Sequence, residues 1–225
     1  ECEYIIVDDE STDKTKEIIK DYSQKNSKII YVSSKDGNPE LLFKKRALDA
    51  GIKKSKYDIL IFTDVDCRLK KGWVKSMASS FHSGADYVIG LSEITKPLNI
   101  ISRFQKIDLM MMMTAGRAKC NLNNPIASTG QNQDYKKYLY YKNDGFMKIK
   151  HSIQGDDSLF MHLCLKQNAK IIFNSDPESF VESRLETKLS SFIKQRIRWA
   201  ADAKVMWNYN KQFFIIILST FFINL

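Results

Sequence analysis

The 225-residue chain has few of the residues that build disulfide frameworks or zinc sites. Its four cysteines are far apart and form neither a C-x-x-C pair nor a Cys/His ligand pattern. Cys67 and Cys164 lie in apolar stretches, where a buried free thiol is expected. The three histidines also show no spacing that would suggest a shared site. These absences exclude a disulfide-stapled domain and favour a reducing compartment.

The sequence also lacks an internal repeat, a low-complexity tract and any linker that would divide it. Its hydrophobic content is 44% and its charged content 27%, with only nine glycines and four prolines. These values exclude a disordered tail and a polytopic membrane protein. A chain of this length is sufficient for one large α/β domain with its own core.

No apolar run is long enough to cross a bilayer, although the last one comes close. Residues 213–225 carry no charge, whereas a transmembrane helix needs about 20 apolar residues. We expect residues 211–225 to begin a membrane span, with a buried terminal helix or strand as the alternative. Basic residues exceed acidic ones just before this run, with Arg196, Arg198, Lys204 and Lys211 against Asp202. This pattern predicts attachment to the cell membrane, with the domain on the cytoplasmic face.

The chain carries a formal net charge of +9, which suits either a polyanion or an anionic membrane surface. The position of the basic residues beside the apolar run favours the membrane. We therefore expect no nucleic acid partner.

Strands and helices are predicted to alternate along the first hundred residues. Apolar runs predict strands at 4–9, 28–34, 57–66 and 85–94, and amphipathic stretches predict helices at 11–25, 41–55 and 72–84. Further helices are expected within 101–119, 158–174 and 190–207, with a strand at the end of the second of these ranges. Alternation of this kind indicates an α/β fold with a doubly wound, mostly parallel sheet. Ligands of such sheets collect beyond the carboxyl ends of the strands.

Two of the predicted strands end in paired acids at that edge. Asp8 and Asp9 follow one strand, and Asp64 and Asp66 follow another. Residues two apart on a strand share a side, so Asp64 and Asp66 are expected to point the same way. Two like charges roughly 5 Å apart repel by about 3 kcal/mol at an effective dielectric near 20. A cation is therefore expected between them.

Two protein families match only part of this pattern. The stretch "IIVDDES" resembles a phosphorelay receiver, and "TDVDC" resembles the Asp-x-Asp of haloacid-dehalogenase-type phosphatases. The chain is nearly twice the length of a receiver. The phosphatase motif continues with Gly-Thr, whereas Cys67 and Arg68 follow here. Neither family explains the second half of the chain.

From residue 1 to about residue 210 the chain resembles the inverting glycosyltransferases of family 2, in the membrane-bound branch that carries a Gln-x-x-Arg-Trp motif. Six motifs occur in the family's order: "VDDESTDKT", "FKKRALDAGI", "TDVD", "ASTGQNQDYKK", "GDD" and "QRIRW". The resemblance implies a GT-A catalytic domain over residues 1–210. The family begins with a strand and helix before the first acidic motif, so we expect that unit to be missing here.

The resemblance also implies roles for individual residues. They are uracil and ribose contacts by Asp8 and Asp9, a diphosphate contact by Lys45, ribose or metal binding by Asp64, metal binding by Asp66, donor-sugar contacts by Gly130 and Asn132, a general base at Asp157 beside Asp156, and acceptor or diphosphate contacts by Gln195, Arg198 and Trp199. Where the family has Glu-Asp this sequence has Asp-Asp, which leaves open which acid is the base. Carboxylate ligands favour Mg²⁺ or Mn²⁺ as the cofactor.

Structural roles compete with several of these assignments. The acids near Asp8 can form a turn and a helix cap, basic residues at a helix start are usually solvated, and one of Asp156 and Asp157 can cap the next helix. The expected partners are a UDP-sugar donor and a glycan or lipid-linked acceptor, in cell-surface polysaccharide or glycolipid synthesis. The alternatives are a receiver-like signalling domain and an inactive domain that only binds a nucleotide sugar.

Overall fold

The structure is a computed structural model that describes residues 1–200, 205, 207–208, 210–212, 214–215 and 219. Its strands are β1 (Tyr4–Asp8), β2 (Ile29–Ser33), β3 (Ile59–Phe62), β4 (Arg68–Leu69), β5 (Tyr87–Gly90), β6 (Ser92–Glu93), β7 (Gln133–Lys136), β8 (Ile171–Asn174) and β9 (Val181–Glu182). Its helices are α1 (Thr15–Lys25), α2 (Lys44–Lys54), α3 (Trp73–His82), α4 (Ile100–Asn121), α5 (Lys137–Lys142), α6 (Ser158–Lys166) and α7 (Leu189–Ala200). Short 3₁₀ turns occur at η1 (Ser34–Asp36), η2 (Met147–Ile149) and η3 (Pro177–Ser179).

The largest sheet has the strand order β3-β7-β5-β8. Strand β7 is antiparallel to both of its neighbours, and β5 is parallel to β8, so β7 alone runs against the other strands of this sheet. Strands β1 and β2 form a separate parallel pair, and β4, β9 and β6 form a small mixed sheet. The predicted α/β class is confirmed, and β3, β5 and β8 of the largest sheet run in the same direction. The insertion of β7 between β3 and β5 is a feature that local patterning did not indicate.

Tyr135 explains why β7 takes this central position. Its ring stacks on Phe62 of β3 at 4.7 Å and on Tyr87 of β5 at 5.6 Å, measured between ring centroids. It also lies 4.9 Å from the ring of Phe160 on α6. Aromatic pairs of this kind add to the burial of apolar area, so one side chain of β7 ties together both neighbouring strands and the helix that covers them.

Both faces of this sheet are buried, each under its own apolar cluster. Tyr87 and Ile89 of β5 belong to the larger cluster with Phe160, whereas Val88 belongs to the smaller cluster with Trp73. Successive residues of a strand point to opposite faces, and here both faces are covered by helices. This explains why the β5 sequence is apolar at consecutive positions rather than at alternate ones.

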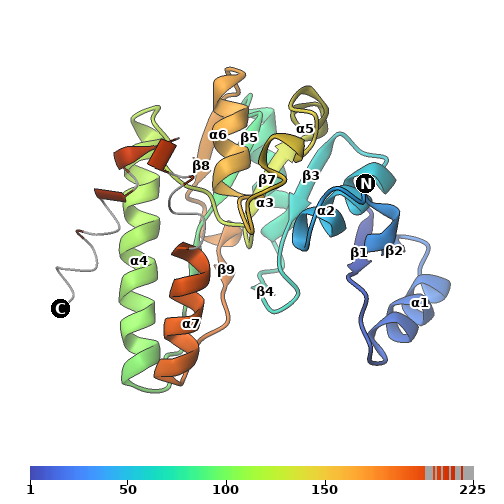
Figure 1. The fold of residues 1–225 in the computed structure, drawn as a ribbon, viewed down its shortest axis with the longest axis horizontal. Helices are drawn as coiled ribbons and strands as arrows, with labels where there is room; N and C mark the ends of the chain where they lie inside the picture. The colour runs from blue at the N-terminus through green and yellow to red at the C-terminus, as the bar shows by residue number, and fades with distance from the viewer. Residues whose placement is uncertain (201–204, 206, 209, 213, 216–218, 220–225) are drawn as a thin grey trace.

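Figure 1 shows how the elements are arranged around the central strands. β1, β2 and α1 lie at one end of the molecule, and α4 and α7 lie next to each other at the opposite end. The contact between α4 and α7 includes Phe104 and Phe192, whose rings meet edge to face at 5.7 Å. The strands of the largest sheet lie between these two ends (Figure 1).

Within the described parts of the chain, no helix is long and apolar enough to cross a membrane. The predicted membrane span at residues 211–225 falls largely outside the described residues, so it stays a prediction.

Candidate functional site

The first acidic pair lies at the end of β1. Asp8 is 5% exposed, and its carboxylate accepts hydrogen bonds from the Ser11 backbone N–H at 3.2 Å and from the Tyr31 hydroxyl at 3.4 Å. Asp9 is exposed. Asp8 therefore stabilises the turn after β1, which is the structural role that the sequence offered as the alternative to nucleotide binding. Asp9 faces solvent. Binding of the base and ribose by these two residues stays a prediction.

The second acidic pair lies in a turn, not on a strand. β3 ends at Phe62, and the Cys67 N–H donates to the Asp64 carbonyl at 3.1 Å to close the turn. The expectation that Asp64 and Asp66 share one side of a strand is wrong, because the chain leaves the extended conformation before reaching them. Asp66 is exposed, whereas the Asp64 side chain is 31% exposed and contacts a lysine.

That lysine is Lys44, the first residue of α2. Its amine lies 2.6 Å from Oδ1 of Asp64 and 3.5 Å from Oδ2 of Asp156. Loss of hydration alone would lower the pKa of Lys44, but the charges of Asp156 and Asp64 outweigh it and hold that pKa above its ordinary value. Lys44 is therefore a fixed positive charge that joins the acidic turn after β3 to the acidic pair before α6.

Asp156 and Asp157 face Lys44 from the start of α6. Asp156 is 6% exposed, while Asp157 caps the helix by accepting from the Ser158 N–H and also accepts from the Gly130 N–H at 3.3 Å. Loss of hydration, together with the negative charge of Asp156, raises the pKa of Asp157 to about 6. The capping role expected for one of the two acids belongs to Asp157. The pKa of about 6 that burial and Asp156 give to Asp157 suits a general base near neutral pH.

Gly130 lies against this cluster because it has no side chain. A Cβ placed on it would lie 3.0 Å from the Lys44 amine and 3.4 Å from Oδ2 of Asp156. Any larger residue would fill the space between the lysine and the acidic pair. Gly130 therefore lies beside Lys44 and Asp156, and a contact between Gly130 and a donor sugar stays a prediction.

Asn132 is placed differently from the expectation. Its side chain is fully buried, where it accepts from Trp73 Nε1 at 3.0 Å and donates to the Leu91 and Ser179 carbonyls at 2.9 and 2.8 Å. A direct contact with a donor sugar would require breaking hydrogen bonds in a dry environment, which costs about 1–3 kcal/mol each. In this structure the Asn132 side chain ties the loop that contains Gly130 to α3, to η3 and to Leu91, the residue after β5.

Lys45 is also turned away from the acidic turn. It is 1% exposed, and its amine donates to the carbonyls of Ser152 and Gln154, the latter at 3.2 Å. Lys44 is thus the lysine that lies at the Asp64 carboxylate. Both lysines belong to the basic run in the sequence. Only the direction in which the first turn of α2 faces decides which of them contacts Asp64. A diphosphate contact by Lys45 stays a prediction.

Helix α7 carries the Gln-x-x-Arg-Trp motif and lies against the loop that contains Gly130 and Gln131. Gln195 accepts from the Gln105 amide at 3.3 Å, and Gln195, Trp199 and Gln131 line one small cavity. Arg198 is exposed and does not line this cavity. The structure therefore brings Gln195 and Trp199 together near the loop, and leaves Arg198 on the outer side of α7.

Arg196 of the same helix also lines this cavity, although the sequence indicated it only as one of the basic residues before the apolar run. Arg196 forms an ion pair with Asp108 of α4, and its guanidinium lies 4.3 Å from the centre of the Trp199 ring. Stacking of arginine on an aromatic face fixes the orientation of both groups. Its position three residues before Trp199 is the only sequence signal for these contacts, because the acidic partner lies far away in the chain.

The carboxylates of the acidic turn fit a divalent metal of the expected kind. Mg²⁺ and Mn²⁺ prefer oxygen ligands, and Mg²⁺ commonly uses one or two carboxylates together with substrate phosphates. Asp66 is exposed and Asp64 is partly exposed beside it. Among the described residues there is no group of three or more His, Cys, Asp or Glu side chains that would hold a metal by itself. A metal at this turn would therefore need phosphate oxygens to complete its ligands.

Comparison with known proteins identifies the relatives of this chain. A family model described as "Glycosyl transferase family 2" matches residues 1–138. No curated protein matches the sequence significantly.

Among solved structures, the mannosyltransferase PcManGT from Pyrobaculum calidifontis, in complex with GDP-Man and Mn²⁺, is 17% identical with a TM-score of 0.62. The alignment covers 88% of this chain and 51% of that one. TarS 1–349 of S. aureus is 18% identical with a TM-score of 0.51, over 80% of this chain and 50% of that one. The chain thus spans about half the length of either structure, and at these identities the likeness concerns the fold.

Proposed function

The chain belongs to glycosyl transferase family 2 and has the GT-A fold, and we propose that it is an inverting enzyme which transfers a sugar from a UDP-sugar to a glycan or lipid-linked acceptor. The observation that carries this proposal is the convergence of Lys44 with Asp64 and Asp156. It joins a turn suited to a metal and a diphosphate to a pair of acids suited to proton transfer.

In the proposed reaction Asp157 accepts the proton of an acceptor hydroxyl. The hydroxyl oxygen forms a bond to the anomeric carbon, and the bond from that carbon to the diphosphate breaks, its electron pair leaving with the nucleoside diphosphate. Attack from the side opposite the leaving group inverts the anomeric centre. The pKa of about 6 for Asp157 supports this role, because the carboxyl is ionised at pH 7 and still binds a proton readily.

Charge on the leaving diphosphate is the second requirement of the reaction. Mg²⁺ or Mn²⁺ held by Asp66 and Asp64 would neutralise that charge when bound. Lys44 supplies a further positive charge from the protein itself, 2.6 Å from Asp64. We propose that Asp8 and Asp9 bind the base and ribose of the donor. We also propose that Gln195 and Trp199 line the acceptor end of the site, where the Trp199 ring would stack against a sugar.

Turnover tests the proposal most directly. The protein is incubated with Mn²⁺ and UDP-glucose, UDP-N-acetylglucosamine or GDP-mannose, with oligosaccharide and lipid acceptors, and release of nucleoside diphosphate is measured. GDP-mannose is included because the similar mannosyltransferase was solved with it. We expect acceptor-dependent release of UDP. Binding of UDP without turnover would favour the binding-only alternative. Covalent labelling by acetyl phosphate without any affinity for UDP would favour the receiver.

We also propose that residues 211–225 attach the domain to the cytoplasmic face of the cell membrane, in polysaccharide or glycolipid synthesis. The excess of basic residues before the apolar run supports this placement. Fractionation of cells that express the protein tests it, with recovery in the soluble fraction as the contrary result.

A further inference from the structure

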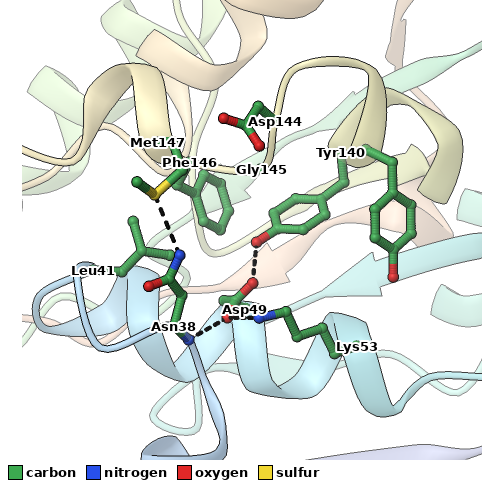
Figure 2. Close-up of a pocket in the computed structure, with 10 residues that line it drawn as sticks. Asn38, Leu41, Asp49, Lys53, Tyr140, Asp144, Gly145, Phe146 and Met147 are labelled. Atoms are coloured by element: carbon green, nitrogen blue, oxygen red, sulfur yellow. Dashed lines mark hydrogen bonds and ion pairs between the residues drawn. The ribbon is translucent and has the colours of Figure 1, made fainter.

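The chain crosses over α2 before it reaches the acidic pair. We call residues 140–154 the strap. At its first end the Tyr140 hydroxyl donates to Asp49 of α2, and further along Asn38 donates its amide to the Met147 sulfur at 3.4 Å (Figure 2). Beyond this part, Lys150 forms an ion pair with Glu40 at 2.5 Å. The strap is thus attached along its length to α2 and to the turn that precedes it.

The first end of the strap is attached through a buried carboxylate. Asp49 is 2% exposed, and it accepts from the Asn38 N–H at 2.5 Å and pairs with Lys53 at 2.9 Å, in addition to its contact with Tyr140. A cavity of about 150 Å³ lies between this carboxylate and the strap, lined also by Leu41 and Phe146. Tyr140, Phe146 and Ile149 of the strap belong to the larger apolar cluster, so packing as well as these polar contacts fixes this part of the strap.

The other end of the strap is attached through Lys45. Its fully buried amine donates to the carbonyls of Ser152 and Gln154. A buried ammonium is costly unless hydrogen bonds compensate it, so these contacts are strongly favoured over a displaced strap. Gly155 follows immediately with a φ of +102°, a conformation that other residues rarely adopt. Asp156 and Asp157 come next, so the amine lies at the last attachment before the acidic pair.

We propose that Lys45 is a positioning residue that holds the end of the strap so that Asp156 and Asp157 face Lys44 and Gly130. Adjacent residues of α2 then divide two tasks. Lys44 contacts the acidic turn and Asp156 directly, and Lys45 sets the backbone from which both acids project. This inference rests on the proposed function for its catalytic consequence, and on the backbone contacts alone for its structural consequence.

Lys45→Met is the test, because it removes the ammonium and keeps most of the stem. Misplacement of a reacting group by about 1 Å can cost about 100-fold in rate. We expect kcat to fall by roughly 10- to 100-fold, while the affinity for UDP and Mn²⁺, measured by calorimetry, stays within about twofold. Lys45→Arg should restore part of kcat, because a guanidinium can also donate to two carbonyls. Lys54→Met, which removes an exposed lysine from the other end of α2, is the matched control and should leave kcat unchanged.

Hydrogen exchange gives a readout that does not need activity. In Lys45→Met the backbone amides of residues 152–158 should exchange faster than in the wild type, while those of β1 and β2 should be unchanged. If Lys45→Met does not fold, the same comparison is made with Lys45→Gln, which keeps an N–H donor on a shorter side chain.

Two results would overturn the proposal. One is a large loss of UDP affinity in Lys45→Met with kcat retained at saturation, which would make Lys45 a ligand of the diphosphate. The other is unchanged kcat together with unchanged exchange at residues 152–158. A wild-type protein with no turnover would instead overturn the proposed function, and hydrogen exchange would still decide whether Lys45 holds the strap.

Discussion

The Lys44 ammonium donates a hydrogen bond to Oδ1 of Asp64 at 2.6 Å, although Lys44 begins a helix and Asp64 lies in the turn after a strand. The sequence led us to expect a cation between paired acids, and in the structure a cation of the chain itself lies at one of them. The same amine lies 3.5 Å from Asp156. One side chain therefore relates the donor end of the proposed site to its proton-transfer end.

Asp157→Asn should abolish most of the turnover. An amide has the shape of the carboxylate and still accepts a hydrogen bond, but it cannot take a proton from the acceptor. We expect kcat to fall by about 10²- to 10⁴-fold with unchanged UDP affinity. Asp144→Asn, at an exposed carboxylate, is the control. Undiminished turnover in Asp157→Asn would remove the assignment of the base, and Asp156→Asn would then be tested in its place.

The rate should depend on pH through the acidic pair. Loss of hydration and the charge of Asp156 raise the pKa of Asp157 to about 6, and the base acts only when ionised. The rate is therefore expected to rise as pH increases through about 6 and to level off above it. In Asp156→Asn one negative neighbour is lost, so the midpoint of the rise should move to lower pH. A midpoint that does not move would mean that another group controls the rate.

Removal of divalent metal should stop the reaction. Chelation with EDTA is expected to reduce turnover to background, and Mn²⁺ or Mg²⁺ in excess should restore it, because the leaving diphosphate then has its counter-charge. Asp66→Asn should raise the metal concentration needed for half-maximal rate, since it removes a charged oxygen ligand. Full turnover in EDTA would exclude a metal role for the acidic turn.

Lys44 and a metal should compete for Asp64 when no nucleotide is bound. An ammonium 2.6 Å from the carboxylate repels a second cation, so Lys44→Met should bind Mn²⁺ several-fold more tightly than the wild type. With UDP present the order should reverse, because the lysine charge then favours the diphosphate. Calorimetric titrations with and without UDP check both halves, and Lys44→Arg should behave like the wild type. Weaker Mn²⁺ binding by Lys44→Met in both titrations would contradict the competition.

Asp134 should make the protein less stable as pH rises. This β7 residue is fully buried, its Oδ1 accepts from the Phe62 N–H at 3.4 Å, and its Oδ2 has no hydrogen-bond partner among the described residues. Burial raises its pKa well above the ordinary value, so the folded state keeps a proton that the unfolded state releases. The free energy of unfolding should then fall by up to about 1.4 kcal/mol per pH unit above the ordinary carboxyl pKa.

Asp134→Asn carries no proton to release, so its stability should depend less on pH than that of the wild type. Urea unfolding at pH 5 and pH 8 measures the difference between the two proteins. An equal loss of stability in both over this range would mean that other groups are responsible.

The family and the class of fold were determined by the sequence, and both predictions are confirmed. Apolar runs and amphipathic periods are local properties, so β1, β2, β3, β5 and the helices between them followed from short stretches of residues. The acidic turn, the Gly130 loop and the acidic pair could likewise be named from motifs. These motifs are short, and each depends on neighbours in the chain.

Several details of the site could not be obtained in this way. The order β3-β7-β5 depends on Tyr135 packing against rings from three other elements. Which of Lys44 and Lys45 lies at Asp64 depends on the direction in which the first turn of α2 faces. The buried hydrogen bonds of Asn132 depend on Trp73 and on two backbone carbonyls far from it in the chain.

The sequence by itself determined which chemical groups this protein has, because residue types and their local spacing are fixed by the order of the chain. Only the tertiary structure decided which of them meet, since Lys44, Asp64, Gly130 and Asp156 come from four separate segments. A charge or a hydrogen-bonding group acts over a few ångströms of space, whatever its separation in sequence. The position of each side chain in the fold therefore decides whether it binds, transfers a proton or supports the residues that do.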